Sequence, residues 1–288
     1  MEEGIPTDRL VRQAYQDKAA DYDRSVKTFD LLAWMGFSIS GWRREAIAQL
    51  QLKPGDTVID IGCGTGLNFP ILQELVGPEG QIIGIDLSTE MLAEAQHTAD
   101  ARGWNNVWLE CTDAARFDYP KNADAILSTY VLILVPTCGE VVARACGALK
   151  PGGRFAVLDM AWPSYMPLWF RHFLPFLKTY GVDEAVLERR AWESVQGTMV
   201  DNLTGISLKK YWFQFFYRCS GVLGPNSWLT ATPGTVAGHW ENPTWPSRPA
   251  SLPGRRRDGI PPGGRGSNAL TMTRECPCGP WDLAVAMS

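Results

Sequence analysis

The sequence predicts an α/β fold in which helices cover both faces of a mostly parallel sheet. Between residues 57 and 160, short β-branched runs alternate with helical stretches, as in consecutive βαβ units. The strand-like runs are apolar on both faces, which is typical of strands buried between helices. The expected strands are Thr57–Ile61, Gln81–Asp86, Asn106–Glu110, Ala123–Thr129 and Arg154–Asp159. Such a doubly wound sheet binds its ligand at the carboxyl ends of the strands.

Helices are expected between these strands and ahead of them. The intervening helices are expected at Gly66–Leu75, Thr89–Ala101 and Gly139–Leu149. Asp8–Ser25 and Ala33–Leu50 also have a helical pattern, and we expect residues 1–50 to form a helical lid over the carboxyl edge of the sheet. The aromatic run Tyr211–Tyr217 is the expected last strand.

The chain changes character after the sheet. An aromatic segment within residues 160–200 is expected to form a cap on a domain that spans residues 51–221. The 67 residues from 222 to 288 hold ten of the twenty prolines and nine glycines, and hydrophobic periodicity ends there. Because such a composition buries too little apolar surface to offset the entropy of ordering, we expect residues 222–288 to be a disordered tail.

Charge and cysteine usage restrict the classes of partner. The formal net charge of −4 provides no general attraction for phosphate backbones, so no nucleic-acid partner is expected. The seven cysteines lack the paired spacing of a zinc site or a disulfide framework, which indicates a reducing, cytoplasmic setting and no metal. The apolar runs fall far short of the roughly 18 residues of a membrane-spanning helix, although a peripheral membrane contact stays open.

A glycine-rich loop, Asp60-Ile-Gly-Cys-Gly-Thr-Gly66, follows the first expected strand. Glycines at alternate positions let the backbone approach a ligand where a Cβ atom would collide. Twenty residues further on, the second strand ends at Asp86, where a carboxylate can accept hydrogen bonds from both hydroxyls of a ribose. The combination predicts a nucleoside site at the sheet edge.

A nicotinamide dinucleotide site is the alternative interpretation of this loop. Its pattern is GxGxxG, whereas the chain reads GxGxG from Gly62, and Leu67 stands where the third glycine would be. An acid, Asp60, also precedes the first glycine, where a dinucleotide loop normally has none. The spacing favours one nucleoside over two.

Three segments together resemble the motifs of class I S-adenosylmethionine-dependent methyltransferases, and the resemblance extends from about Leu10 to Gly221. The segments are the loop at 60–66, Cys111-Thr-Asp-Ala114 and Leu149-Lys-Pro-Gly-Gly-Arg154. The resemblance implies a Rossmann-like sheet of seven mostly parallel strands, the last one antiparallel, and S-adenosyl-L-methionine as the cofactor.

The same resemblance implies a set of cofactor-binding residues. Asp60 is expected near the methionine amino group and Asp86 at the ribose. Leu87 is expected against the adenine ring, and Asp113 at the adenine amino group. The full expected set is Tyr22, Asp60, Gly62, Cys63, Gly64, Gly66, Asp86, Leu87, Asp113, Ala114 and Ser128.

A narrower resemblance is to quinone-biosynthesis C-methyltransferases and bacterial phosphatidylethanolamine N-methyltransferases. Val11–Tyr15 and Ala19–Asp23 are similar to their lid helix, in which Tyr22 would close over the methyl end of the cofactor. The resemblance implies in-line methyl transfer to a lipophilic or aromatic acceptor, such as a phospholipid head group or a quinone precursor. A soluble small-molecule acceptor, or cofactor binding without transferase activity, are the alternatives.

The catalytic residues are less well defined by the sequence, because no side chain shows the pairing of a base with an orienting group. The candidates are Tyr22 in the lid, Tyr130 after the fourth strand and His172 in the aromatic cap. The aromatic segment Met160–Leu177 is expected to line the acceptor pocket. Neither the acceptor nor the oligomeric state follows from the sequence.

Overall fold

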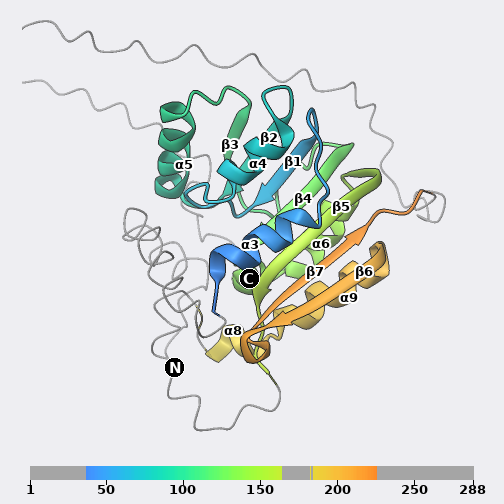
Figure 1. Ribbon diagram of the computed structural model, residues 1–288. Coiled ribbons are helices and arrows are strands. Elements are labelled where there is room, and N and C mark those ends of the chain that lie inside the picture. Colours follow the sequence, from blue (N-terminus) through green and yellow to red (C-terminus); the bar gives the residue numbers. More distant parts are fainter. Residues whose placement is uncertain (1–36, 164–181, 183, 226–288) are drawn as a thin grey trace, which may run out of the picture. The chain divides into compact units, whose positions relative to one another are not determined.

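The computed structural model describes residues 37–163, 182 and 184–225. Within these residues a seven-stranded sheet has the strand order β3-β2-β1-β4-β5-β7-β6 (Figure 1). The strands are β1 Thr57–Ile61, β2 Gln81–Asp86, β3 Val107–Cys111, β4 Ala123–Thr129, β5 Leu149–Met160, β6 Thr204–Tyr211 and β7 Phe216–Val222. The predicted lid up to residue 36, the tail from residue 226 and most of the segment Met160–Leu177 lie outside the described residues.

The first five strands run parallel, and β7 pairs antiparallel with both β5 and β6. This confirms the predicted α/β class and the mostly parallel, doubly wound sheet with an antiparallel last strand. From β1 the chain proceeds outward to β2 and β3, then returns to place β4 on the other side of β1. That reversal opens a crevice at the carboxyl ends of β1 and β4, where a ligand of such a sheet binds.

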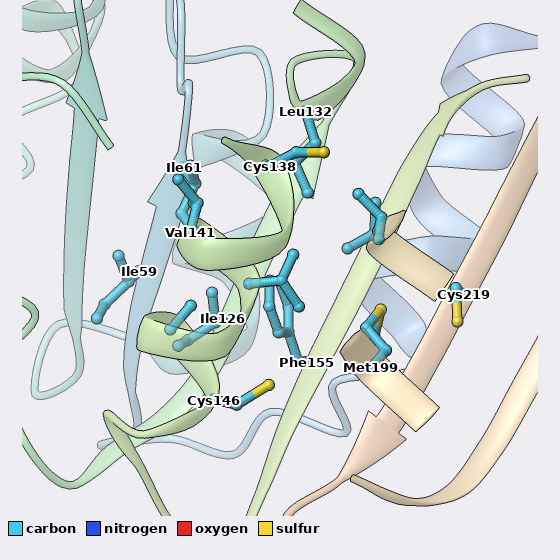
Figure 2. Close-up of a cluster of buried hydrophobic side chains, with 14 of the residues drawn as sticks. Ile59, Ile61, Ile126, Leu132, Cys138, Val141, Cys146, Phe155, Met199 and Cys219 are labelled. Carbon is cyan, nitrogen blue, oxygen red and sulfur yellow. The ribbon is translucent and has the colours of Figure 1, made fainter. Parts of the chain in front are cut away.

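Helices pack on both faces of the sheet, which is why its strands are apolar throughout. The helices are α3 Ile39–Ala48, α4 Phe69–Val76, α5 Thr89–Ala101, α6 Cys138–Cys146, α8 Glu184–Glu188 and α9 Ala191–Asn202. Figure 1 shows α3 in front of the sheet and α6 and α9 behind it. Alternate strand residues point to opposite faces of the sheet and pack in two hydrophobic layers, so that Val58 packs toward α3 and Ile59 toward α6. Figure 2 shows Ile59, Ile126 and Phe155 in the second layer.

Local chemistry explains where the helices near the crevice begin. The Ser88 hydroxyl accepts from the Met91 N–H at 3.2 Å and caps α5, which spans the predicted range. The helix expected from Gly66 begins later, at Phe69, because Gly66 has a φ of 79° that an α-helix does not allow. No helix among the described residues has the length and apolarity that a membrane crossing requires.

The expected last strand Tyr211–Tyr217 is wrong. Tyr211 ends β6, Phe216 begins β7, and a short 3₁₀ turn, η4, lies between them at Trp212–Gln214. The three residues of η4 have φ values of 38°, 53° and 68°, which an extended strand cannot contain. The aromatic run therefore crosses a hairpin, and its strand propensity comes from residues on both sides of a turn.

Candidate functional site

A cavity of about 530 Å³ opens at the carboxyl edge of the sheet. Its wall comes from four segments that follow consecutive neighbours in the strand order. They are the glycine loop at 62–64 after β1, residues 85–88 with Met91 after β2, residues 112–116 after β3, and the loop between Tyr130 and Glu140 after β4. The predicted crevice is thus a cavity to which the ends of four parallel strands contribute.

The glycines of the loop have different structural roles. A Cβ atom at Gly62 would lie 2.2 Å from the Val131 side chain, and one at Gly66 would lie 2.6 Å from the Phe69 ring. These two glycines permit close packing against the chain itself. Gly64, with a φ of 55°, has nothing within 4 Å of the same position. It lines the cavity, so it is the point where a ligand can lie directly against the backbone.

Asp86 is held in the cavity wall by backbone donors from two segments. Its Oδ2 atom accepts from the Gly64 N–H and its Oδ1 atom from the Ser88 N–H, both at 2.9 Å. Burial raises the pKa of this carboxyl group, and the N–H donors of Ser88, Gly64 and Leu87 oppose that effect. Because each carboxylate oxygen has a second lone pair, Asp86 can still accept hydrogen bonds from two adjacent hydroxyl groups.

The segment after β3 forms the next part of the wall. Asp113 Oδ1 accepts from the Ala115 N–H at 2.9 Å, which orients the carboxylate by a short local turn. The Thr112 N–H donates to the Asp86 carbonyl at 3.0 Å, which ties this segment to the end of β2. Leu87 and Ala114 also line the cavity, so an apolar surface lies beside the two carboxylates.

Several expected cofactor-binding residues lie behind the wall instead of in it. Asp60 is fully buried, and both of its carboxylate oxygens accept from Asn68 Nδ2, at 3.0 and 2.9 Å. Burial raises the pKa of Asp60 to about 7 against the opposing effects of Asn68 and Arg43. Ser128 is buried and donates to the Ile61 carbonyl at 3.3 Å.

Cys63 is also buried, and desolvation raises the pKa of its thiol well above the usual value. The group is therefore protonated at neutral pH, and we assign it no nucleophilic role. Neither Cys63 nor Gly66 lines the cavity, since a Cβ atom at Gly84 would lie 2.8 Å from the Cys63 Sγ atom and one at Gly66 would meet the Phe69 ring.

Among the candidate catalytic residues, Tyr130 lines the cavity. It has a φ of 62°, an unfavourable conformation for an aromatic residue and one that is frequent at functional sites. The Arg43 guanidinium lies 5.3 Å from the centre of its ring, and Phe216 packs edge-on at 6.1 Å. Tyr22 and His172 lie outside the described residues.

Sequence reasoning missed the polar side chains behind the loop. Arg43, Asn68 and Thr129 are buried and lie near Asp60 or its hydrogen-bond partners. Two features of the sequence could have pointed to these residues: an arginine on the apolar face of a predicted helix and an asparagine at a helix start. Neither signal identifies a partner, because the partners are distant in the sequence.

Comparison with known proteins identifies the family of the chain. A methyltransferase domain family matches residues 52–197. The demethylmenaquinone methyltransferase of Desulfitobacterium hafniense is 32% identical over 177 residues, which are 56% of this chain and 70% of the relative. The demethylmenaquinone methyltransferase of Symbiobacterium thermophilum is 27% identical over 175 residues, 60% of this chain and 67% of the relative.

Solved structures share the fold at low identity. Geranyl diphosphate C-methyltransferase from Streptomyces coelicolor has a TM-score of 0.55 and 13% identity, with 77% of this chain and 99% of that chain covered. Phosphoethanolamine N-methyltransferase 2 from Haemonchus contortus has a TM-score of 0.54 and 15% identity, with coverages of 73% and 60%. The chain therefore belongs to the methyltransferase domain family, as a class I S-adenosylmethionine-dependent methyltransferase of the branch that includes the demethylmenaquinone methyltransferases.

Proposed function

We propose that this methyltransferase binds S-adenosylmethionine in the cavity at the carboxyl edge and methylates a lipophilic aromatic acceptor of the quinone-precursor type. The observation that carries the cofactor assignment is the pairing of Gly64 and Asp86. The space beside the Gly64 backbone admits a ligand atom that a Cβ would displace, and the Asp86 carboxylate fixed to it can accept from a ribose. The residues present thus fit the cofactor.

The order of the wall segments gives the direction in which the cofactor lies. Asp113, Asp86, the glycine loop and Tyr130 follow β3, β2, β1 and β4, which are consecutive neighbours in the sheet. Asp113 would hold the adenine amino group, Leu87 and Ala114 the adenine ring and Asp86 the ribose, so that Gly62 and Gly64 would hold the methionine end. The reacting end would then face Tyr130.

Bound S-adenosylmethionine supplies an electrophilic methyl group for an in-line displacement. The chain must align the acceptor with that methyl group and exclude water, effects that reach about 7–11 kcal/mol in well-oriented reactions. A ring carbon or phenol also has to lose a proton. Tyr130 is our candidate for that step within the described residues, with Tyr22 and His172 as the candidates outside them.

The aromatic surroundings of Tyr130 support a lipophilic acceptor. Phe216 contacts the Tyr130 ring, and Trp162 and Trp212 both pack against Phe215 at ring-centre distances of 5.7 Å. These rings gather on the β5 and β7 side, next to the proposed methyl end. The names of the curated relatives favour a quinone precursor within this chemistry. An acceptor with a long apolar tail is presented by a lipid surface, so a peripheral membrane contact belongs to the proposal.

Transfer of a radiolabelled methyl group tests the acceptor. The full chain is incubated with labelled S-adenosylmethionine and demethylated quinones in detergent, with phospholipids and a panel of soluble amines and phenols in parallel. We expect label in the quinone fraction, and less than about a hundredth of it with Gly64→Ala. Label confined to a soluble acceptor or to phospholipid would contradict the quinone assignment, and no label in any fraction would favour a binding protein without transferase activity.

A further inference from the structure

Behind the glycine loop lies a buried network of polar side chains from four elements. Arg43 in α3 donates through Nη1 to Asn68 Oδ1 at 2.9 Å and to Thr129 Oγ1 at 2.8 Å. Asn68, which precedes α4, donates through Nδ2 to both oxygens of Asp60 at the end of β1 and to Thr129 Oγ1 at 3.2 Å. Arg43 is only 7% exposed and Asp60 is not exposed at all.

Two charged groups face Asp60, and they act in opposite directions. The Arg43 guanidinium, from α3, lowers the pKa of Asp60, whereas the Asp86 carboxylate, from the end of β2, raises it. Asp60 in turn raises the pKa of the neighbouring Cys63 thiol. Arg43 donates to the neutral oxygens of Asn68 and Thr129, so its charge compensates Asp60 across the amide of Asn68.

The geometry around Asn68 suits an ionised Asp60. Both carboxylate oxygens accept from the same amide nitrogen, and protonation would make one of these two oxygens the weaker acceptor. A protonated Asp60 would therefore release one of the two contacts. Asn68 is the residue between the loop that contains Gly64 and the first turn of α4, so a change at Asp60 is transmitted to the cavity wall.

The same guanidinium reaches the other side of the cavity. Thr129, which accepts from Arg43, immediately precedes Tyr130, and the Tyr130 ring lies 5.3 Å from the guanidinium carbon. Tyr130 lines the cavity with a left-handed backbone conformation that its surroundings must maintain. Arg43 thus contacts residues that adjoin two separate parts of the cavity wall, the glycine loop and Tyr130.

We propose that Arg43 is a positioning residue: through Asn68 and Thr129, its guanidinium holds the ends of β1 and β4 so that the glycine loop and Tyr130 keep their places in the cofactor cavity. The proposal rests on the cofactor site proposed above. Without the positive charge the pKa of Asp60 rises further, and Asp60 is protonated at neutral pH. Cofactor affinity then falls at neutral pH and recovers as the solution is made alkaline.

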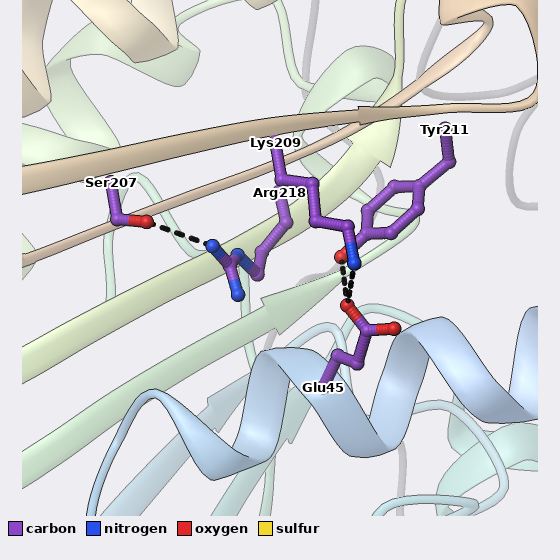
Figure 3. Close-up of polar contacts among 5 residues, drawn as sticks. All are labelled: Glu45, Ser207, Lys209, Tyr211 and Arg218. Carbon is purple, nitrogen blue, oxygen red and sulfur yellow. Dashed lines mark hydrogen bonds and ion pairs between the residues drawn. The ribbon is translucent and has the colours of Figure 1, made fainter.

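Arg218 provides a matched control. It is also a buried arginine, 7% exposed, on β7 facing α3, and its side chain donates to Ser207 Oγ at 2.8 Å (Figure 3). That hydrogen bond joins β7 to β6 and does not belong to the network around Asp60. Replacing either arginine by methionine removes a buried charge and keeps most of the side-chain volume, so the two variants share the structural cost.

The experiment is calorimetric titration of the full chain with S-adenosylhomocysteine from about pH 6.5 to 9, with melting curves at each pH. We expect Arg43→Met to weaken affinity at pH 7 by about tenfold or more, with the deficit shrinking toward pH 9, and Arg43→Lys to restore much of the wild-type profile. Arg218→Met should lower the melting temperature and leave the affinity profile unchanged. Unchanged affinity in Arg43→Met, or the same pH-independent loss in both methionine variants, would overturn the proposal.

Thr129→Val keeps the proposal testable if Arg43→Met does not fold. The substitution removes the hydroxyl that accepts from Arg43 and Asn68 and keeps the side-chain shape. We expect affinity for S-adenosylhomocysteine to fall severalfold, and an unchanged affinity would overturn the role of the network. A wild-type protein that binds no S-adenosylhomocysteine would instead contradict the proposed cofactor site itself.

Discussion

The two halves of the sheet edge are built differently. On the β3-β2-β1 side, backbone N–H groups hold the carboxylates of Asp86 and Asp113 in the wall of a cavity. On the β5-β7-β6 side, aromatic rings such as Phe215 and Phe216 gather around a hairpin with left-handed residues. The first half depends on contacts between residues close in sequence or in adjacent strands, and the second on side chains brought together from distant segments. The β3-β2-β1 half, which we propose binds the cofactor and call the cofactor half, is therefore specified by motifs, and the aromatic half by tertiary packing.

Polar contacts also join α3 to the aromatic half. Glu45 Oε2 accepts from Lys209 Nζ at 2.6 Å and from the Tyr211 hydroxyl at 2.9 Å, beside the Arg218–Ser207 pair (Figure 3). Lys209 lowers the pKa of Glu45, which is ionised in this arrangement. Because α3 also supplies Arg43, one helix contacts both halves of the edge.

The largest effect on the cofactor half is expected from Gly64→Ala. Gly64 and Gly152 both have positive φ values, 55° and 80°, and both have open space where a Cβ would stand. Gly152→Ala is therefore the control, and each substitution should cost about 1 kcal/mol of stability. Only Gly64→Ala places a methyl group in the cavity, so it should weaken S-adenosylhomocysteine binding by about a hundredfold or more. Equal affinities of the two variants would show that the ligand lies elsewhere.

An intermediate effect is expected from Asp159→Asn on the aromatic half. Asp159 is buried at the end of β5, where Oδ2 accepts from the Ile133 N–H at 3.0 Å, and burial raises its pKa from 3.8 to about 7. The folded state thus holds a proton that the unfolded state loses between these values, so this contribution to stability falls as pH rises from about 4 to 7.

The amide that replaces the carboxyl group in Asp159→Asn does not titrate. We therefore expect urea unfolding at about pH 5 and pH 8 to show a larger fall in the free energy of unfolding between these pH values for the wild type than for Asp159→Asn. Parallel changes in both proteins would mean that Asp159 is ionised throughout this range.

The smallest effect is expected from Glu45→Gln. The Lys209 and Glu45 side chains are 51% and 43% exposed, and solvent screens pairs of this kind to about 0–1 kcal/mol. Melting curves should move by only a few degrees, and the affinity for S-adenosylhomocysteine should stay at the wild-type value. A large loss of either quantity would show that α3 depends on the hairpin for its position.

Local patterns predicted the cofactor half closely. The expected ranges of β1, β2, β4 and α5 match the structure, because each is a short apolar or capped segment bounded by turn residues. The hairpin at Trp212–Gln214 was not predictable from the same information. Its residues have no preference for left-handed φ values, so the conformation must come from packing such as the edge-on contact of Trp212 with Phe37.

The site shows the same division. The loop pattern and the strand-end acids predicted Gly62, Gly64, Asp86 and Asp113, all of which line the cavity. Arg43 was missed because its partners lie 25 and 86 residues away. The sequence also could not distinguish residues that line the cavity from residues buried behind it. Burial of a residue such as Asp60 depends on helices packed behind the loop.

We propose that Asp86 and the glycine loop form a site for one nucleoside and not for a dinucleotide. Calorimetric titration of the wild type and of Asp86→Ala with S-adenosylhomocysteine, and of the wild type with NAD, tests it directly. We expect micromolar binding of S-adenosylhomocysteine, no heat with NAD, and an affinity loss of about 1.5–3 kcal/mol in Asp86→Ala, because a charged acceptor is removed. Binding of NAD without S-adenosylhomocysteine, or an unchanged affinity in a folded Asp86→Ala variant, would contradict it.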